Sequence, residues 1–140
     1  GKNYGYVKDK AKIVASYNLG IYSHEDVSFY DYYQDSWFGS TIVAISAVNT
    51  NFSAELSKGD QIISVKVGTN ELYKVATSSV IDSSTGERYT PAQQLVNYLT
   101  QVKCKVGDQV VFTVIKSGET AQKTVTVSLK QYIYKNTWVF

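Results

Sequence analysis

The sequence predicts a small α+β domain built on a mostly antiparallel β-sheet. Tyr occurs 12 times and Pro once, and abundant Tyr together with Val, Ile, Thr and Ser favours strands over helices. Short apolar or alternating runs separated by turn residues recur along the chain, which is the pattern of successive strands. One longer stretch has instead the period of an amphipathic helix.

Length and composition narrow the class of protein. With 140 residues, 44% hydrophobic and 19% charged, the chain fits one domain that can bury a core. A net charge of +2 is too small to indicate a nucleic-acid partner, and no apolar run has the length that membrane insertion requires. With one Cys and one His we expect no disulfide framework, no metal and no cofactor. The absence of Met indicates a piece of a longer protein.

In the N-terminal half, the strongest pattern is the nearly continuous apolar run at residues 41–48 (TIVAISAV), typical of a strand buried on both faces. A β-type run at 13–17 precedes it. Residues 23–40 are acidic and aromatic without a sustained period, which predicts a long loop or a short irregular helix. Residues 52–56 predict a short helix of one or two turns, and Gly59 suits the left-handed turn after it.

The C-terminal half shows two hairpin patterns. Residues 61–67 alternate and predict a strand, with a returning partner at 71–75, whereas the turn-rich residues 76–87 are expected to loop out. Residues 109–116 and 120–130 predict two further strands joined by a tight turn.

The clearest helix start is Thr90-Pro91. Thr90 can accept a hydrogen bond from the amide of Gln93, whose side chain can reach back, and Pro is tolerated at the first helical position. The apolar residues that follow have the spacing of an amphipathic helix about three turns long, ending near Thr100. They are Ala92, Leu95, Val96 and Leu99.

Three pieces carry a resemblance to a known family. Strand 41–48 is followed by residues 56–63 (LSKGDQII), the long helix by residues 106–108 (VGD), and the chain then enters the closing hairpin. Their order resembles a PDZ domain of the bacterial type found in HtrA/Deg trypsin-like serine proteases, in which an aliphatic-x-x-Gly-Asp-x-Ile run opens the strand after the short helix. Residues 4–8 (YGYVK) are similar to the linker that leaves the protease domain. The chain departs from the family at 49–55, where the usual Ser-Pro-Ala and Ala-Gly are replaced.

The resemblance implies a PDZ-like fold, a small mostly antiparallel sheet or partial barrel with one short and one longer helix. It divides the chain into a linker at 1–11 from an upstream protease domain, a PDZ-like domain at 12–131 and an aromatic tail at 132–140. The implied function is to capture hydrophobic C-termini of peptides or unfolded proteins for an exported serine endopeptidase, secreted or membrane-tethered, with that protease domain as a partner in cis.

The resemblance also implies which residues bind the peptide. In such a groove a turn holds the terminal carboxylate, and an edge strand pairs with the peptide beside an apolar helix face. Two registers are open for the carboxylate loop, since one has the better spacing and the other has the family's glycine. The first is Lys12, Ile13 and Val14, and the second is Leu19, Gly20 and Ile21; the binding strand is Ala15, Ser16 and Tyr17, and the helix face is Ala92, Leu95, Val96 and Leu99. The same helical stripe also fits a face packed in the core.

Four further features bear on function: the residues available for catalysis, an aromatic cluster, the single cysteine and the C-terminal tail. Serine catalysis needs a nucleophile, a base and an orienting acid, and His24 is the single candidate base, so we expect no catalysis by this chain. The resemblance implies that the parent protein is a trypsin-like endopeptidase. The aromatic cluster at 30–38 suggests an alternative function, a stand-alone cell-surface adhesion or ligand-binding domain that uses this Tyr/Trp-rich loop; such a run also fits a core cover. Without a second Cys or His, Cys104 is expected to be an inert buried or half-buried thiol; the alternative is a thiol whose pKa is lowered by the flanking Lys103 and Lys105. The tail at 132–140 either packs on the core or enters a groove, its own or that of a second copy, which would give self-association.

Overall fold

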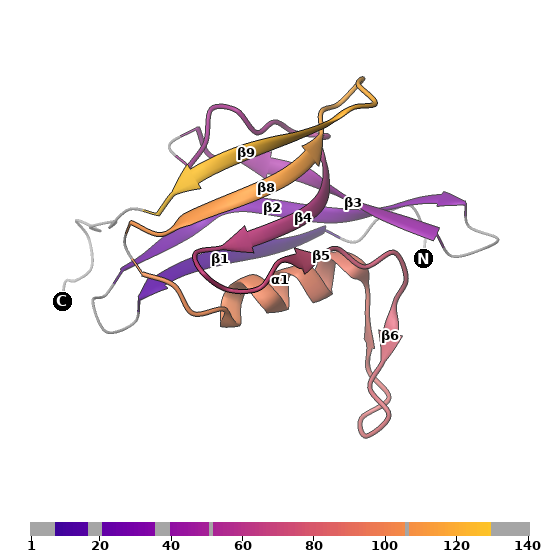
Figure 1. Cartoon of the computed structure of the whole chain (residues 1–140). Helices are drawn as coiled ribbons and strands as arrows, with labels where there is room; N and C mark the ends of the chain where they lie inside the picture. The colour runs from indigo at the N-terminus through magenta and orange to yellow at the C-terminus, as the bar shows by residue number, and fades with distance from the viewer. Residues whose placement is uncertain (1–7, 17–20, 36–39, 51, 106, 130–140) are drawn as a thin grey trace.

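The computed structural model describes residues 8–16, 21–35, 40–50, 52–105 and 107–129 (Figure 1). At residues 8–16 and 21–26 and at 34, 35 and 40 it describes the backbone alone. The elements are β1 (Lys8–Ser16), β2 (Ile21–Asp35), β3 (Ser40–Val48), β4 (Gln61–Val67), β5 (Tyr73–Lys74), β6 (Val80–Ile81), β7 (Arg88–Tyr89), α1 (Pro91–Gln101), β8 (Gln109–Ile115) and β9 (Gln122–Ser128).

All strand pairs are antiparallel. The main sheet has the order β1-β2-β3-β4-β8-β9, and β5 pairs with β4 away from this path. Helix α1 lies along the β1 end of the sheet, and β6 and β7 form a separate hairpin that projects from the body (Figure 1). The predicted class, α+β with a mostly antiparallel sheet and one longer helix, is confirmed.

The core lies between the sheet and α1 because strands and helix each turn their apolar positions inward. In β8 alternate residues are buried, Val110, Phe112 and Val114, as the period of a strand requires. Phe112 also meets Phe52 edge to face, with ring centroids 6.2 Å apart. The turn segment before β4 is thereby fixed against the centre of the sheet.

Two predictions for the N-terminal half are wrong. The stretch 23–40 is not a loop or a helix along most of its length, since β2 runs through Asp35. From Phe29 to Tyr32 buried residues alternate with more exposed ones, but Ser28 is buried as well as its neighbours, and the acid at the inward position of Asp31 concealed the period. Strand β1 begins at Lys8, so residues 8–11, expected in the linker, belong to the sheet.

The predicted short helix at 52–56 is also wrong. The amides of Phe52 and Ser53 both donate to the carbonyl of Asn49, which closes one turn. The Ser53 hydroxyl then accepts from the amide of Glu55, a local bond that competes with helical pairing. The left-handed residue after it is confirmed, since Gly59 has φ +93°.

The elements of the C-terminal half follow the sequence closely. The expected partner at 71–75 is β5, and the expected loop at 76–87 contains β6 and most of its hairpin. Thr90 caps α1 by accepting from the amide of Gln93 at 3.2 Å. The Gln93 side chain does not reach back; it donates to Asn97 at 3.0 Å, one turn along the helix. The tail at 132–140 lies outside the described residues.

Candidate functional site

The predicted site residues that the structure describes lie on β1, on α1 and, for Ile21, at the start of β2, at one end of the sheet. Among the described strands β1 pairs only with β2, and α1 lies along its other side (Figure 1). An edge strand and an apolar helix, two of the parts that peptide capture by strand addition requires, are therefore neighbours.

The backbone of β1 contains the first register of the carboxylate loop. Lys12, Ile13 and Val14 lie inside β1, where Ile13 pairs with Ser23, so they form strand and not a loop. A run of β-branched residues favours this extended backbone. The pairing of β1 with β2 is irregular on both sides of Ile13, with register shifts between Ala11 and Ile13 and between Ile13 and Ser16.

The other predicted strand and loop residues lie around the connection from β1 to β2. Ala15 and Ser16 end β1, and Ser16 pairs with Ile21, the first residue of β2. Tyr17, Leu19 and Gly20 lie outside the described residues.

The predicted helix face is buried. Its four residues belong to the hydrophobic core, and none is more than 7% exposed. The interpretation as a core stripe is therefore confirmed, and in this structure the four side chains line no open groove. The residues are Ala92, Leu95, Val96 and Leu99.

Asp31 of β2 fixes the start of α1, and sequence reasoning missed it. Its Oδ1 accepts a 2.7 Å hydrogen bond from the amide of Ala92, and the side chain is fully buried. Burial raises the pKa of this carboxyl, against hydrogen bonds from Thr90 and Ala92 that lower it. An acid at an inward position of an alternating strand was the available signal, because such a group needs a buried donor.

A second buried carboxylate, that of Asp60, links two turns at the ends of β4 and β8. Asp60 binds Lys116 through its Oδ2 and accepts from the amides of Ser57 at 2.9 Å and Ser117 at 3.1 Å. These bonds join the turn before β4 to the turn after β8. Asp60, part of the Gly59-Asp60 pair that carried the family resemblance, therefore has a structural role in this chain. We call its bonds to Ser57, Lys116 and Ser117 the Asp60 clasp.

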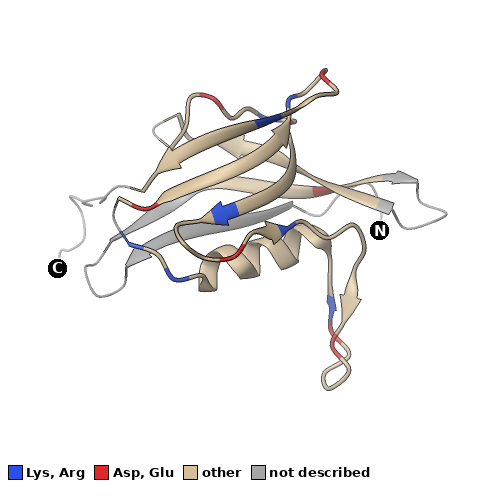
Figure 2. Ribbon diagram, in the orientation of Figure 1, with Lys and Arg blue, Asp and Glu red and all other residues tan. Residues whose placement is uncertain are grey.

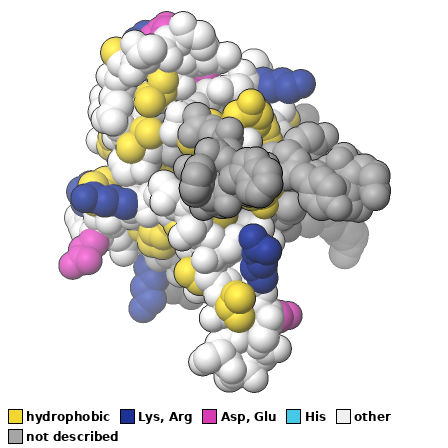
Figure 3. Space-filling model, turned by 90° about the vertical axis from the view of Figure 1, so that its right-hand side faces the viewer, with side chains coloured by type: hydrophobic (Ala, Val, Ile, Leu, Met, Phe, Trp, Pro, Cys, Tyr) yellow, Lys and Arg dark blue, Asp and Glu magenta, His cyan; other side chains and the backbone are white. Residues whose placement is uncertain are grey.

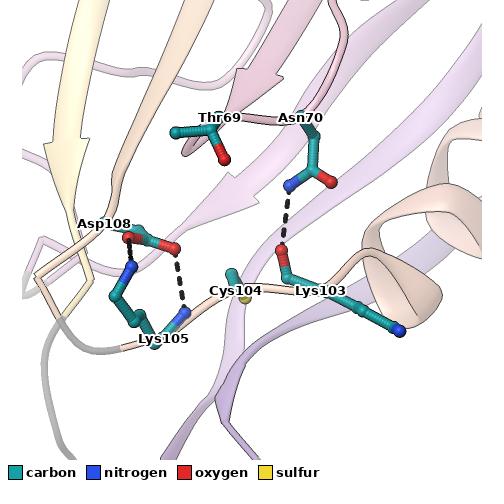
Figure 4. Close-up of a pocket in the computed structure, with 6 residues that line it drawn as sticks. All are labelled: Thr69, Asn70, Lys103, Cys104, Lys105 and Asp108. Carbon is teal, nitrogen blue, oxygen red and sulfur yellow. Dashed lines mark hydrogen bonds and ion pairs between the residues drawn. The ribbon is translucent and has the colours of Figure 1, made fainter.

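The pocket around Cys104 is polar, and Asn70, Lys105 and Asp108 in its lining are hydrogen-bonded (Figure 4). It encloses about 280 Å³, and both the amide and the ammonium of Lys105 donate to Asp108 at 3.0 Å. The side chain of Asn70 donates to the carbonyl of Lys103 at 2.9 Å. Burial first, and then the charge of Asp108, raise the pKa of the half-buried Cys104 thiol to about 11, which agrees with the expected inert thiol and not with activation by the flanking lysines.

The aromatic cluster is divided between strand and undescribed chain. Tyr30 and Tyr33 are half-buried on β2, whereas Tyr32 is exposed. Trp37 and Phe38 lie outside the described residues. The aromatic side chains that the structure describes thus lie on a regular strand, and one of them is largely open to solvent.

The remaining surface offers no concentrated site. Basic and acidic residues are interspersed over the described part of the chain (Figure 2). Figure 3 shows the apolar side chains of one face as separate patches, and the projecting hairpin carries exposed Val80 and Ile81. No three metal-ligating side chains of the His, Cys, Asp or Glu type gather within the described ranges. The described helix is too short to cross a membrane.

No known family model matches this chain, and a search of the curated proteins finds no match. The likeness to PDZ domains therefore rests on the residues and spacings of the sequence.

Proposed function

We propose that this chain is a peptide-binding module that captures extended, apolar C-terminal peptides by adding them to the β1 end of its sheet. The observation that supports this function best is the position of β1, the strand at one end of the described sheet, beside the apolar helix α1. Strand addition gives affinity through main-chain hydrogen bonds, and side-chain pockets beside a helix give specificity.

A rigid frame makes the proposal physically reasonable. The bond from the Ala92 amide to Asp31 ties the first turn of α1 directly to β2, so that helix and sheet hold a fixed spacing. Binding to a fixed frame requires less ordering than binding to a mobile one. The entropic cost then falls mainly on the peptide.

Charge favours a ligand with a free carboxylate. The sequence of β1 contains three lysines, Lys8, Lys10 and Lys12, against one acid, Asp9. A local excess of positive charge attracts a terminal carboxylate and repels basic peptides. In the longer protein this module would deliver C-termini to an HtrA-like trypsin-type endopeptidase outside the cytoplasm, and the chain itself would not hydrolyse casein.

A titration tests the function. Labelled peptides of about ten residues, ending in Ala, Val, Leu or Phe with a free carboxylate, are added to ¹⁵N-labelled protein. We expect dissociation constants on the order of 10–100 μM for the Val, Leu and Phe peptides, because a short strand gains few contacts after its ordering cost. Amide shifts should concentrate in β1, β2 and α1. The matched control is the same peptide with an amidated C-terminus, which should bind at least several-fold more weakly.

The alternative function, a stand-alone adhesion or ligand-binding domain, is favoured by one observation, the exposure of Tyr32 on β2. Tyr32→Ala separates the two. Adhesion through the aromatic surface predicts loss of ligand binding in this variant, whereas peptide capture at the β1 end predicts an unchanged peptide affinity. Shifts confined to residues 30–33 in the titration would refute peptide capture at the β1 end.

A further inference from the structure

The direction in which β1 runs, relative to β2 and to α1, follows from its pairing. Its first residue, Lys8, pairs with Tyr30, which adjoins the Asp31 that binds the start of α1. Its last residue, Ser16, pairs with Ile21 at the far end of β2. Strand β1 therefore runs antiparallel to β2 and in the same direction as α1, as Figure 1 also shows.

The strand occupies the space between β2 and α1. A peptide that added to the outer side of β1 would have to enter between β1 and α1, where the apolar face of the helix is already at most 7% exposed. A peptide that took the place of β1 would instead find both requirements together, a strand edge on β2 and the apolar face of α1.

We propose that β1 is a built-in ligand: residues 8–16 fill the peptide site formed by β2 and α1, and a peptide binds by replacing them. This proposal rests on the peptide-binding function above and adds its regulation. The module is closed until β1 leaves, so capture requires competition with the chain's own strand.

Strand β1 is a terminal strand of the described sheet and pairs irregularly with its neighbour. It pairs with a single described strand, so its departure breaks no other strand pair. Its pairing has two register shifts, whereas β8 and β9 pair without one from Gln109 to Ile115. An irregular terminal strand opens at lower free energy than a regular central one.

Competition between β1 and a peptide for the same site determines how far the apparent affinity for the peptide is reduced. A strand tethered to its own site acts at an effective concentration in the millimolar range. If the open state is populated at about 1%, the apparent dissociation constant of a peptide is about 100-fold larger than its intrinsic value. Loosening β1 should therefore tighten peptide binding, and locking it should abolish binding.

The test uses the full chain with β1 locked or loosened. Lys10 and Ser28 are directly opposite on β1 and β2, so Lys10→Cys with Ser28→Cys, in a Cys104→Ser background, permits a reversible cross-strand disulfide. Ala11→Pro removes an amide donor in the middle of β1 and loosens it. The labelled peptides ending in Val, Leu or Phe are titrated against wild type, the Ala11→Pro variant, and the double-Cys variant in its oxidised and reduced forms.

We expect the oxidised variant to bind at least tenfold more weakly than its own reduced form, and Ala11→Pro to bind roughly tenfold more tightly than wild type. The reduced form is the matched control, since it differs only in the disulfide. Equal binding by the oxidised and reduced forms would overturn the built-in ligand and leave peptide binding intact. If no peptide binds even to an Ala11→Pro variant whose NMR spectrum is folded, the peptide-binding function itself is wrong. If that variant is unfolded, the oxidised and reduced comparison decides alone: weaker binding when oxidised supports the built-in ligand, and absence of binding in both forms and in wild type refutes the function.

Discussion

Replacing Asp60 by Ala should be among the most destabilising single changes in this chain. The carboxylate is 1% exposed and joins the turn before β4 to the turn after β8 through Lys116 and the amides of Ser57 and Ser117. Without it, two amides and an ammonium lose this acceptor, although Ser57 and Ser117 themselves lie at the surface. Alanine offers none of them a replacement.

The magnitude follows from these three donors. Each amide bond to a charged acceptor contributes about 1.5 kcal/mol at the low end of its range, and the two amides together account for about 3 kcal/mol. The ammonium adds little, because the Lys116 side chain is 20% exposed and still donates to the carbonyl of Glu55. We therefore expect a loss of about 3–4 kcal/mol in the free energy of unfolding, within the range for breaking a buried pair.

Urea denaturation of the variants in a double-mutant cycle measures this loss in the free energy of unfolding. Asp60→Ala, Lys116→Ala and the double variant should give a coupling energy of about 0.5 kcal/mol, the low end of the range for contacting groups, since the ammonium keeps a second acceptor in the carbonyl of Glu55. The control is Lys105→Ala, whose partner is Asp108 and whose side chain is 73% exposed, so it should cost less than about 1 kcal/mol. If Asp60→Ala costs no more than Lys105→Ala, the Asp60 clasp does not hold the two turns together.

Three further outcomes follow from the same structure. Gly59→Val should cost at least about 1 kcal/mol by urea denaturation, because φ is +93° and a Cβ there lies 3.3 Å from the Ser117 hydroxyl; Gly86→Val, also at positive φ but in open space on the projecting hairpin, should cost less, and the reverse order would contradict this. The stability of Asp31→Asn relative to wild type should increase as pH rises from about 4 towards 7, since a carboxyl with a raised folded pKa loses its contribution as it ionises; a pH-independent difference in denaturation midpoints would refute it. The Cys104 thiol, with its pKa raised to about 11, should react with a disulfide reagent at pH 8 far more slowly than a free cysteine, and an equal rate would contradict the burial that raises it.

The sequence predicted the elements whose period is uninterrupted. The helix start at Thr90 and the alternation of β8 and β9 are local properties, and the structure confirms both. Strand β2 was missed because Asp31 occupies an inward position. A carboxyl can be buried there because the amide of Ala92, far away in the sequence, donates a hydrogen bond to it. No window of neighbouring residues contains that donor.

The candidate site was predicted in its parts and not in its arrangement. The sequence pointed to an edge strand near residues 13–17 and to an apolar helix, and both exist. Which strand lies next to α1 depends on the order of the sheet, which is a matter of long-range pairing. Local patterns therefore could not predict that β1 would be the strand that lies beside α1.

The projecting hairpin offers a way to report on α1 from a distance. Its base is tied to the helix, because the Gln94 side chain donates to the carbonyls of Ser78 and Tyr89 at 3.1 and 3.0 Å. Its tip is a tight turn in which Asp82 accepts from the amides of Ser84 and Thr85. A fluorophore or spin label at the tip would therefore move as a lever with the first turn of the helix while touching neither the sheet nor a ligand.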